Sequence, residues 1–170
     1  MKGGLVRNRP LLVALGAAVA LVGAGCGSSS SSSRTATSTA KSVAGGSVEI
    51  SSSNLSGLGA VLVDGHGRTL YIFEPDQAKK VTCTGGCASV WPPVPLPGTA
   101  KPVTSGAVKL SLVGSDPNPG GGRVVTYDGW PLYNYVEDPT PGSSTGEGID
   151  SSGGFWYVIS PSGTVIKQKS

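Results

Sequence analysis

The 170-residue sequence is poor in the side chains on which metal sites depend. It has one histidine, His66, and three cysteines. A zinc or copper centre needs three or four soft or nitrogen ligands, and Cys26 has another role, argued below. Covalent haem attachment would need a C-x-x-C-H motif, which the sequence lacks. We therefore expect no metal and no cofactor.

Catalytic constellations are equally scarce. Asp64 and His66 lie in one glycine-bearing turn, which is a poor start for a Ser/His/Asp triad. Residues 142–146, GSSTG, match G-x-S-x-G only as a string, because no strand precedes them and no helix follows. The composition therefore favours a protein that is not an enzyme.

Long apolar runs are limited to one, at the amino terminus. Lys2, Arg7 and Arg9 precede fifteen apolar residues, LLVALGAAVALVGAG, at positions 11–25. The run is shorter than the roughly 20 residues that a bilayer-spanning helix needs. A basic segment followed by a short apolar one is typical of a secretory signal, and we predict a signal peptide over residues 1–25.

The end of this run resembles the bacterial lipobox. Residues 22–26 read VGAGC, with small residues directly before Cys26. The resemblance implies that Cys26 carries acyl chains such as palmitate and becomes the first residue of the mature protein. One departure is Gly23, where the usual lipobox has leucine. The alternative is an ordinary secretory signal in which Cys26 is incidental.

The charge balance argues against a nucleic-acid partner. The full sequence has 13 basic and 10 acidic residues, and three of the basic ones lie in the leader. The mature chain therefore has no net formal charge, whereas a nucleic-acid-binding surface is usually basic. Membrane attachment would come from the acyl chains, at about 0.8 kcal/mol per buried methylene.

The mature chain divides into a tether and one domain. Residues 26–46 are mostly Ser, Thr, Ala and Gly, a composition that cannot offset its chain entropy by burial, so we expect a flexible tether. Residues 47–170 show short apolar runs between Gly, Pro, Asn and Asp, without a helical period. We expect a single small all-β domain of antiparallel hairpins, with strands at 59–63, 69–73, 108–113, 123–127, 132–136, 155–159 and 164–167.

An internal repeat runs through this domain. Residues 67–76 match residues 129–138 over the pattern G-x-x-L-Y-x-(F/Y)-x-x-D. Each copy follows an Asp-Gly turn and precedes a tryptophan, Trp91 or Trp156. We place repeat 1 at about 57–97 and repeat 2 at about 120–160, and expect two similar halves in one pseudo-twofold structure.

The repeated motif resembles that of a known family. Its two copies are Tyr71-x-Phe73-x-x-Asp76 and Tyr133-x-Tyr135-x-x-Asp138. Together with residues 82–93, TCTGGCASVWPP, they are similar to the secreted-repeat lipoproteins of actinobacteria, which carry a Yx(FWY)xxD motif. The resemblance implies a cell-envelope location and a repeat fold, and it implies no settled activity.

The motif residues allow two interpretations. Side chains alternate along a strand, so Tyr71 and Phe73 share one face, as do Tyr133 and Tyr135. In the structural interpretation the rings fill the core, and the two aspartates cap turns or accept phenolic hydrogen bonds. In the functional one the rings line a binding groove with a carboxylate at its rim. The second copy is the better candidate, because Asn134 suggests that one side of its strand meets water.

Cys83 and Cys87 form the remaining cysteine pair. In an exported protein such a pair predicts a disulfide, here one that shapes the loop before Trp91. A reversible redox pair is the alternative, because small strained loops raise the reduction potential.

We therefore expect a non-catalytic lipoprotein on the extracytoplasmic face of the cell membrane. Its β domain would bind or scaffold an envelope protein or a glycan. An extracytoplasmic redox or electron-transfer protein using Cys83 and Cys87, and a carbohydrate-binding module, remain the alternatives.

Replacing Cys26 by serine tests the anchor. The Cys26→Ser protein cannot be acylated, so we expect it to move from the membrane fraction to the soluble extracytoplasmic fraction, as measured by fractionation and immunoblotting. Ser28→Ala, two residues further on, is the control and should stay with the membrane. Unchanged retention of Cys26→Ser would contradict lipidation.

Overall fold

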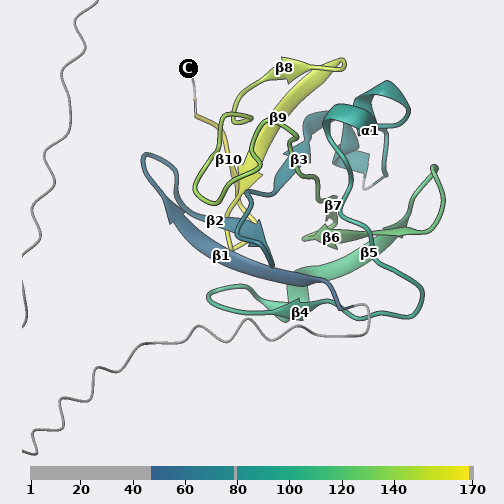
Figure 1. Ribbon diagram of the computed structural model, residues 1–170, viewed down its shortest axis with the longest axis horizontal. Coiled ribbons are helices and arrows are strands. Elements are labelled where there is room, and N and C mark those ends of the chain that lie inside the picture. The colour runs from purple at the N-terminus through teal and green to yellow at the C-terminus, as the bar shows by residue number, and fades with distance from the viewer. Residues whose placement is uncertain (1–46, 79, 169–170) are drawn as a thin grey trace, which may run out of the picture. The chain divides into compact units, whose positions relative to one another are not determined.

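The computed structural model describes residues 47–78 and 80–168. The predicted signal peptide, Cys26 and the predicted tether lie outside the described residues. The part that the structure describes is built from short strands (Figure 1). It therefore confirms the all-β prediction.

Ten strands and three short helical turns lie within the described residues. The helical turns are η1 (Glu74–Ala78), α1 (Gly86–Val90) and η2 (Leu110–Leu112). No helix in the described ranges is long and apolar enough to span a membrane. The strands are β1 (Glu49–Leu55), β2 (Gly59–Asp64), β3 (Tyr71–Phe73), β4 (Val103–Thr104), β5 (Val113–Pro117), β6 (Arg123–Tyr127), β7 (Trp130–Pro131), β8 (Asp150–Ser151), β9 (Gly154–Ile159) and β10 (Val165–Ile166).

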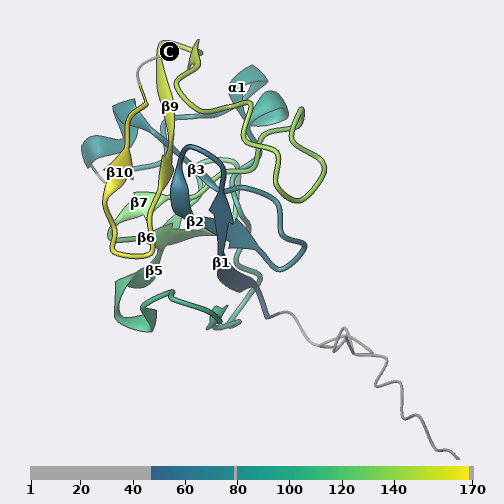
Figure 2. The ribbon, with the colours of Figure 1, turned by 90° about the vertical axis from the view of Figure 1, so that its left-hand side faces the viewer.

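The strands form three small sheets. Their orders are β2-β1-β4, β10-β9-β3 with β8 added to β9, and β5-β6-β7. All pairs are antiparallel except β1 with β4. Gly-bearing turns close the β6-β7 and β9-β10 hairpins, as expected from the Asp-Gly and Ser-Gly pairs in the sequence. Figure 2 shows the β1-β2 hairpin and the β9-β10 hairpin side by side.

Two of the expected strands are wrong in detail. Within residues 108–113, Leu110–Leu112 form η2, and the strand begins only at Val113. Leu110 in this turn is 61% exposed, so the apolar alternation there does not mark a buried face. Over 132–136 only Tyr133 makes β-bridges, to Tyr71 and Pro93. Proline has no N–H to donate to a ladder, which keeps this pairing short.

The two repeats exchange strands. Tyr71 and Tyr133 each donate a backbone hydrogen bond to the other's carbonyl at 2.9 Å. The strand that contains Trp156, from repeat 2, pairs with β3 of repeat 1. The matching segment after Trp91, from repeat 1, pairs with Tyr133 of repeat 2 through Pro93. The repeats are therefore intertwined about a pseudo-twofold axis that passes between the two tyrosines.

Both faces of the motif strands are buried, in two different clusters. Leu70 and Ile72 face one cluster, while Tyr71 and Phe73 face the other, which confirms the predicted alternation. The first, the aliphatic core, contains Ile50, Leu62, Leu70, Ile72, Val94, Leu96, Val125, Tyr127, Leu132 and Ile159. The second, the aromatic core, contains Leu55, Val61, Val63, Tyr71, Phe73, Cys83, Trp91, Tyr133, Trp156 and Val158.

The exchange predicts that neither repeat folds alone. We expect fragments 47–106 and 107–170 to be unfolded separately, because each lacks the strand that covers its motif, and to form a native-like 1:1 complex when mixed. Near-ultraviolet circular dichroism of the buried tryptophans reports the packing, with the uncut 47–170 chain as reference. A fragment with a native tryptophan signal on its own would contradict the exchange.

Candidate functional site

Four aromatic rings from both repeats form a continuous stack inside the molecule. The indoles of Trp91 and Trp156 lie face to face, with centroids 4.0 Å apart and planes 3° apart. Phe73 stacks on Trp156 at 4.3 Å, and Tyr135 stacks on Trp91 at 4.1 Å. Each tryptophan therefore stacks on the motif ring of the other repeat. Such a pair adds about 0.5–1.5 kcal/mol beyond its buried area.

The motif tyrosines and aspartates also pair across the repeats. The Tyr71 hydroxyl donates to Asp138 Oδ2, and the Tyr133 hydroxyl donates to Asp76 Oδ2 at 2.5 Å. All four side chains are buried. Burial, together with the neighbouring carboxylate, raises the pKa of both phenols far above the ordinary tyrosine value, so the phenols remain donors. The phenolic hydrogen bond predicted for the aspartates is present, and its donor comes from the other repeat.

Each aspartate also holds the loop that follows it. Asp76 accepts from Thr82 N at 2.9 Å and from Thr82 Oγ1 at 2.5 Å. Asp138 accepts from Thr145 N at 3.1 Å and from Thr145 Oγ1 at 2.6 Å, and from the Ser143 hydroxyl. The G-x-S-x-G string thus supplies donors to a buried carboxylate.

The two carboxyl groups differ in acidity. Burial raises the pKa of Asp76 above the ordinary value, and the Thr82 hydrogen bonds offset only part of this effect. Burial also raises the pKa of Asp138, but the combined hydrogen bonds, those from Ser143 and Thr145 foremost, outweigh it, so the pKa of Asp138 lies below the ordinary value. The Asp138 carboxylate therefore stabilises the fold at neutral pH, whereas ionisation of Asp76 opposes it.

The expected disulfide between Cys83 and Cys87 is present, with a Cα–Cα distance of 5.3 Å. Cys83 is 2% exposed and belongs to the aromatic core, and its Sγ lies 3.8 Å from the Trp91 carbonyl oxygen. Cys87 lies in α1, whose carbonyl at Cys87 accepts the Trp91 N–H at 2.8 Å. The disulfide thus fixes the turn that delivers Trp91 to the ring stack.

These positions favour the structural interpretation of the motif over that of an open binding groove. Tyr133 is fully buried, and Tyr135 is half-buried against Trp91. Their rings contact other rings and a carboxylate, because the second repeat's strand is covered by a segment of the first. The burial of Tyr133 therefore favours the structural interpretation of Tyr133 and Tyr135 over the ligand-stacking one.

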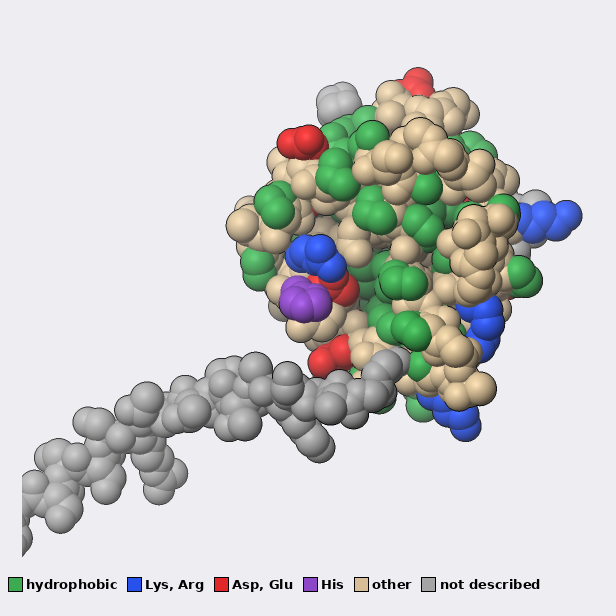
Figure 3. Space-filling view, turned by 45° about the vertical axis from the view of Figure 1, so that its right-hand side comes forward, with side chains coloured by type: hydrophobic (Ala, Val, Ile, Leu, Met, Phe, Trp, Pro, Cys, Tyr) green, Lys and Arg blue, Asp and Glu red, His purple; other side chains and the backbone are tan. Residues whose placement is uncertain are grey.

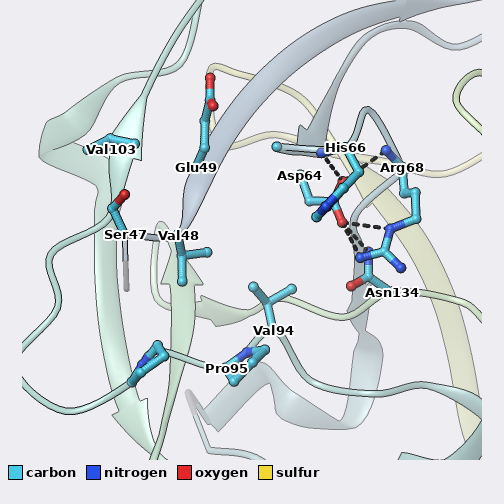
Figure 4. Close-up of a pocket in the computed structure, with 12 residues that line it drawn as sticks. Ser47, Val48, Glu49, Asp64, His66, Arg68, Val94, Pro95, Val103 and Asn134 are labelled. Carbon is cyan, nitrogen blue, oxygen red and sulfur yellow. Dashed lines mark hydrogen bonds and ion pairs between the residues drawn. The ribbon is translucent and has the colours of Figure 1, made fainter. Parts of the chain in front are cut away.

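A cavity of about 450 Å³ lies elsewhere, where β1, the turn after β2 and the segment after β7 meet (Figure 4). Its polar wall contains Asp64, which is 6% exposed. Asp64 Oδ1 accepts from His66 N at 2.9 Å and Arg68 N at 3.0 Å, so it caps its own turn. Asp64 Oδ2 accepts from Arg68 Nε at 2.8 Å and Asn134 Nδ2 at 3.3 Å.

The opposite wall of the cavity is apolar. Figure 4 shows Val48 and Val94 pointing toward each other below the Asp64 turn, with Pro95 beside them. Figure 3 shows the imidazole of His66 next to basic and acidic side chains, at the edge of a group of hydrophobic ones. The full lining is Ser47, Val48, Glu49, Asp64, Gly65, His66, Arg68, Val94, Pro95, Pro97, Val103 and Asn134.

The polar wall lies where the two repeats differ. Asp64 pairs with Ile50 at the end of the β1-β2 hairpin. At the matching end of the β5-β6 hairpin, Tyr127 pairs with Val113, and the Tyr127 ring is buried. At the 62-residue offset Arg68 corresponds to Trp130, and Asn134 corresponds to the buried Ile72. Asn134 is half-buried at the cavity, as its polar character suggested.

Most of the cavity was not predictable from motifs. His66 and Asp64 stood out only as poor triad candidates, and Arg68 and Glu49 carried no signal. Within the described part of the chain, no three His, Cys, Asp or Glu side chains converge as a metal site would require. The repeat alignment gave one usable clue, because it pairs the polar residues Arg68 and Asn134 with the apolar residues Trp130 and Ile72 of the other repeat.

The fold and the motif define a β protein of two intertwined repeats whose motif residues lie inside the molecule. The sequence profile of the family described as "Secreted repeat of unknown function" matches residues 55–95 and 117–160. The chain therefore belongs to that family, which confirms the resemblance to a secreted-repeat family and indicates an extracytoplasmic location. No curated protein and no solved structure matches the chain.

Removing one phenolic donor tests the exchanged pairs. We expect Tyr71→Phe to lower the free energy of unfolding by about 1–3 kcal/mol and to raise the pKa of Asp138, because the buried carboxylate loses a donor. Urea denaturation and a nuclear magnetic resonance (NMR) titration of the Asp138 carboxyl measure both effects. Tyr135→Phe is the control, since its hydroxyl has no hydrogen-bond partner among the described residues. An unchanged Asp138 pKa in Tyr71→Phe would contradict the pairing.

Proposed function

We propose that this protein is a lipid-anchored, non-catalytic binding module on the extracytoplasmic face of the cell membrane, and that the cavity at Asp64 is its binding site. The observation that carries the proposal is the cavity itself. It combines an apolar wall with ordered polar groups, which is the usual character of a small-ligand site. Its occupant is a small molecule or the end of a larger envelope protein or glycan.

The anchor part of the proposal rests on the leader. The family is described as secreted, and the basic, apolar and small-residue segments before Cys26 agree with export followed by acylation. A serine-rich segment between Cys26 and the domain would let the cavity reach ligands away from the membrane surface.

Hydrogen bonding at Asp64 supports a binding role over a catalytic one. A general base needs a lone pair free to take a proton. The Asp64 carboxylate accepts four hydrogen bonds from its own turn and from Asn134, and it pairs with Arg68 at 2.6 Å. These contacts hold the group in place and occupy its acceptor sites.

A redox role for the disulfide has less support. Thiol exchange requires a thiolate to reach a sulfur atom, and Cys83 is packed in the aromatic core. We propose a structural role, for which the bond would have a reduction potential below about −300 mV.

A cavity-filling variant tests the binding site. We expect NMR shift changes from small amphiphilic probes to gather at Val48 and Val94 in the wild type and to vanish in Val103→Trp, whose indole would occupy the cavity. Val103 is 44% exposed, so the substitution should be tolerated. Val136→Trp is the matched control, because Val136 is 46% exposed and does not line the cavity.

The result that would contradict the proposal is equally specific. Shift changes that persist in Val103→Trp would place binding elsewhere. A folded wild-type domain whose cavity resonances respond to no probe would remove the cavity as a binding site.

A further inference from the structure

We infer that the cavity at Asp64 selects a small organic cation: one ammonium-type charge on an apolar body. This inference rests on the proposed function and specifies its ligand class. It follows from the charges around the cavity, from the acceptors left free in its wall and from the shape of the apolar side.

The basic group in the wall is already neutralised. Arg68 Nη2 lies 2.6 Å from Asp64 Oδ2, and Arg68 Nε donates to the same oxygen at 2.8 Å. An anionic ligand would have to share this guanidinium with a nearly buried carboxylate. The Asp64–Arg68 pair therefore contributes no net charge to the cavity.

Glu49 supplies the remaining charge. One of its oxygens, Oε1, accepts from the Ser105 hydroxyl at 2.9 Å. The other, Oε2, has no partner among the described residues. The Glu49 stem packs closely against the turn, since a Cβ built on Gly65 would lie 3.2 Å from Glu49 Cβ. With His66 neutral, the charged lining residues Glu49, Asp64 and Arg68 sum to −1.

The wall also offers an acceptor that suits an ammonium group. Asn134 donates through Nδ2 to Asp64, which leaves its Oδ1 as an acceptor at the cavity (Figure 4). An ammonium group has three donors and no acceptor. It can therefore pair with the exposed Glu49 carboxylate or with this amide oxygen, whereas a carboxylate ligand would meet either as a repulsive neighbour.

The apolar wall favours an apolar body for the rest of the ligand. Val48, Val94 and Pro95 present hydrocarbon to the cavity and no charge. A ring or short branched chain would cover this surface and gain the usual free energy of apolar burial. The cavity volume of about 450 Å³ falls within the range of small-ligand sites.

Three probes that share one body separate charge from shape. Phenethylamine, 2-phenylethanol and 3-phenylpropionate all carry a phenyl ring on two methylenes, and they end in a cationic, a neutral and an anionic group. We expect phenethylamine to bind about three- to fivefold more tightly than the alcohol, the size of a partly exposed ion pair, and 3-phenylpropionate to bind most weakly. NMR titration at pH 7.5 gives the three dissociation constants.

Variants assign the preference to Glu49. We expect Glu49→Gln to keep the Ser105 hydrogen bond and to bind phenethylamine and 2-phenylethanol equally. Glu137→Gln is the control, because Glu137 is exposed and does not line the cavity. An unchanged preference in Glu49→Gln, or tightest binding of 3-phenylpropionate, would overturn the cation inference while leaving the binding site in place. Failure of all three probes to bind at the cavity would overturn the proposed function together with this inference.

Discussion

Each repeat buries a carboxylate that only the other repeat can supply with a phenol. Burying a charged carboxyl group without hydrogen bonds is costly, and loop donors alone leave one oxygen of Asp76 unsatisfied. Tyr133 completes that set, and Tyr71 donates to Asp138 Oδ2, whose other donor is Gly146 N at 3.4 Å. The requirement favours both copies in one structure, because each carboxylate receives its phenolic donor from the other repeat.

The ring stack follows from the same arrangement. Once the motif segments lie against each other through Tyr71 and Tyr133, the segment that begins at each tryptophan covers the opposite motif. The two indoles then meet at the axis. Gly146 shows how tight this packing is, because a Cβ there would lie 2.8 Å from the Trp91 ring and 2.9 Å from Tyr71. The disulfide and the capped loops hold the two tryptophan-bearing segments in register.

Local patterns predicted several of the strands and could not predict their partners. The alternation in Leu70–Phe73 correctly separated two faces, because side-chain direction in a strand depends only on its neighbours. The pairing of Tyr71 with Asp138, instead of with Asp76 in its own repeat, depends on strand exchange between distant segments, which no local pattern encodes. Strand β1 was missed for a related reason: Ser51–Ser53 show no apolar alternation, and backbone pairing with β2 defines the strand.

The motif residues that the repeats share stabilise the fold, whereas the cavity is lined by residues at which the repeats differ. The paired tyrosines, aspartates and tryptophans make all their described contacts inside the molecule. At the cavity, Asn134 stands where the other repeat buries Ile72, so the chain forgoes roughly 1.5–3 kcal/mol of apolar burial at that position. Asn134 instead steadies Asp64, which in turn fixes Arg68. Asn134 thus holds a polar group in place at the edge of an apolar cavity, whereas the other repeat fills the same position with Ile72. Core packing does not require such a polar group, but a binding site does.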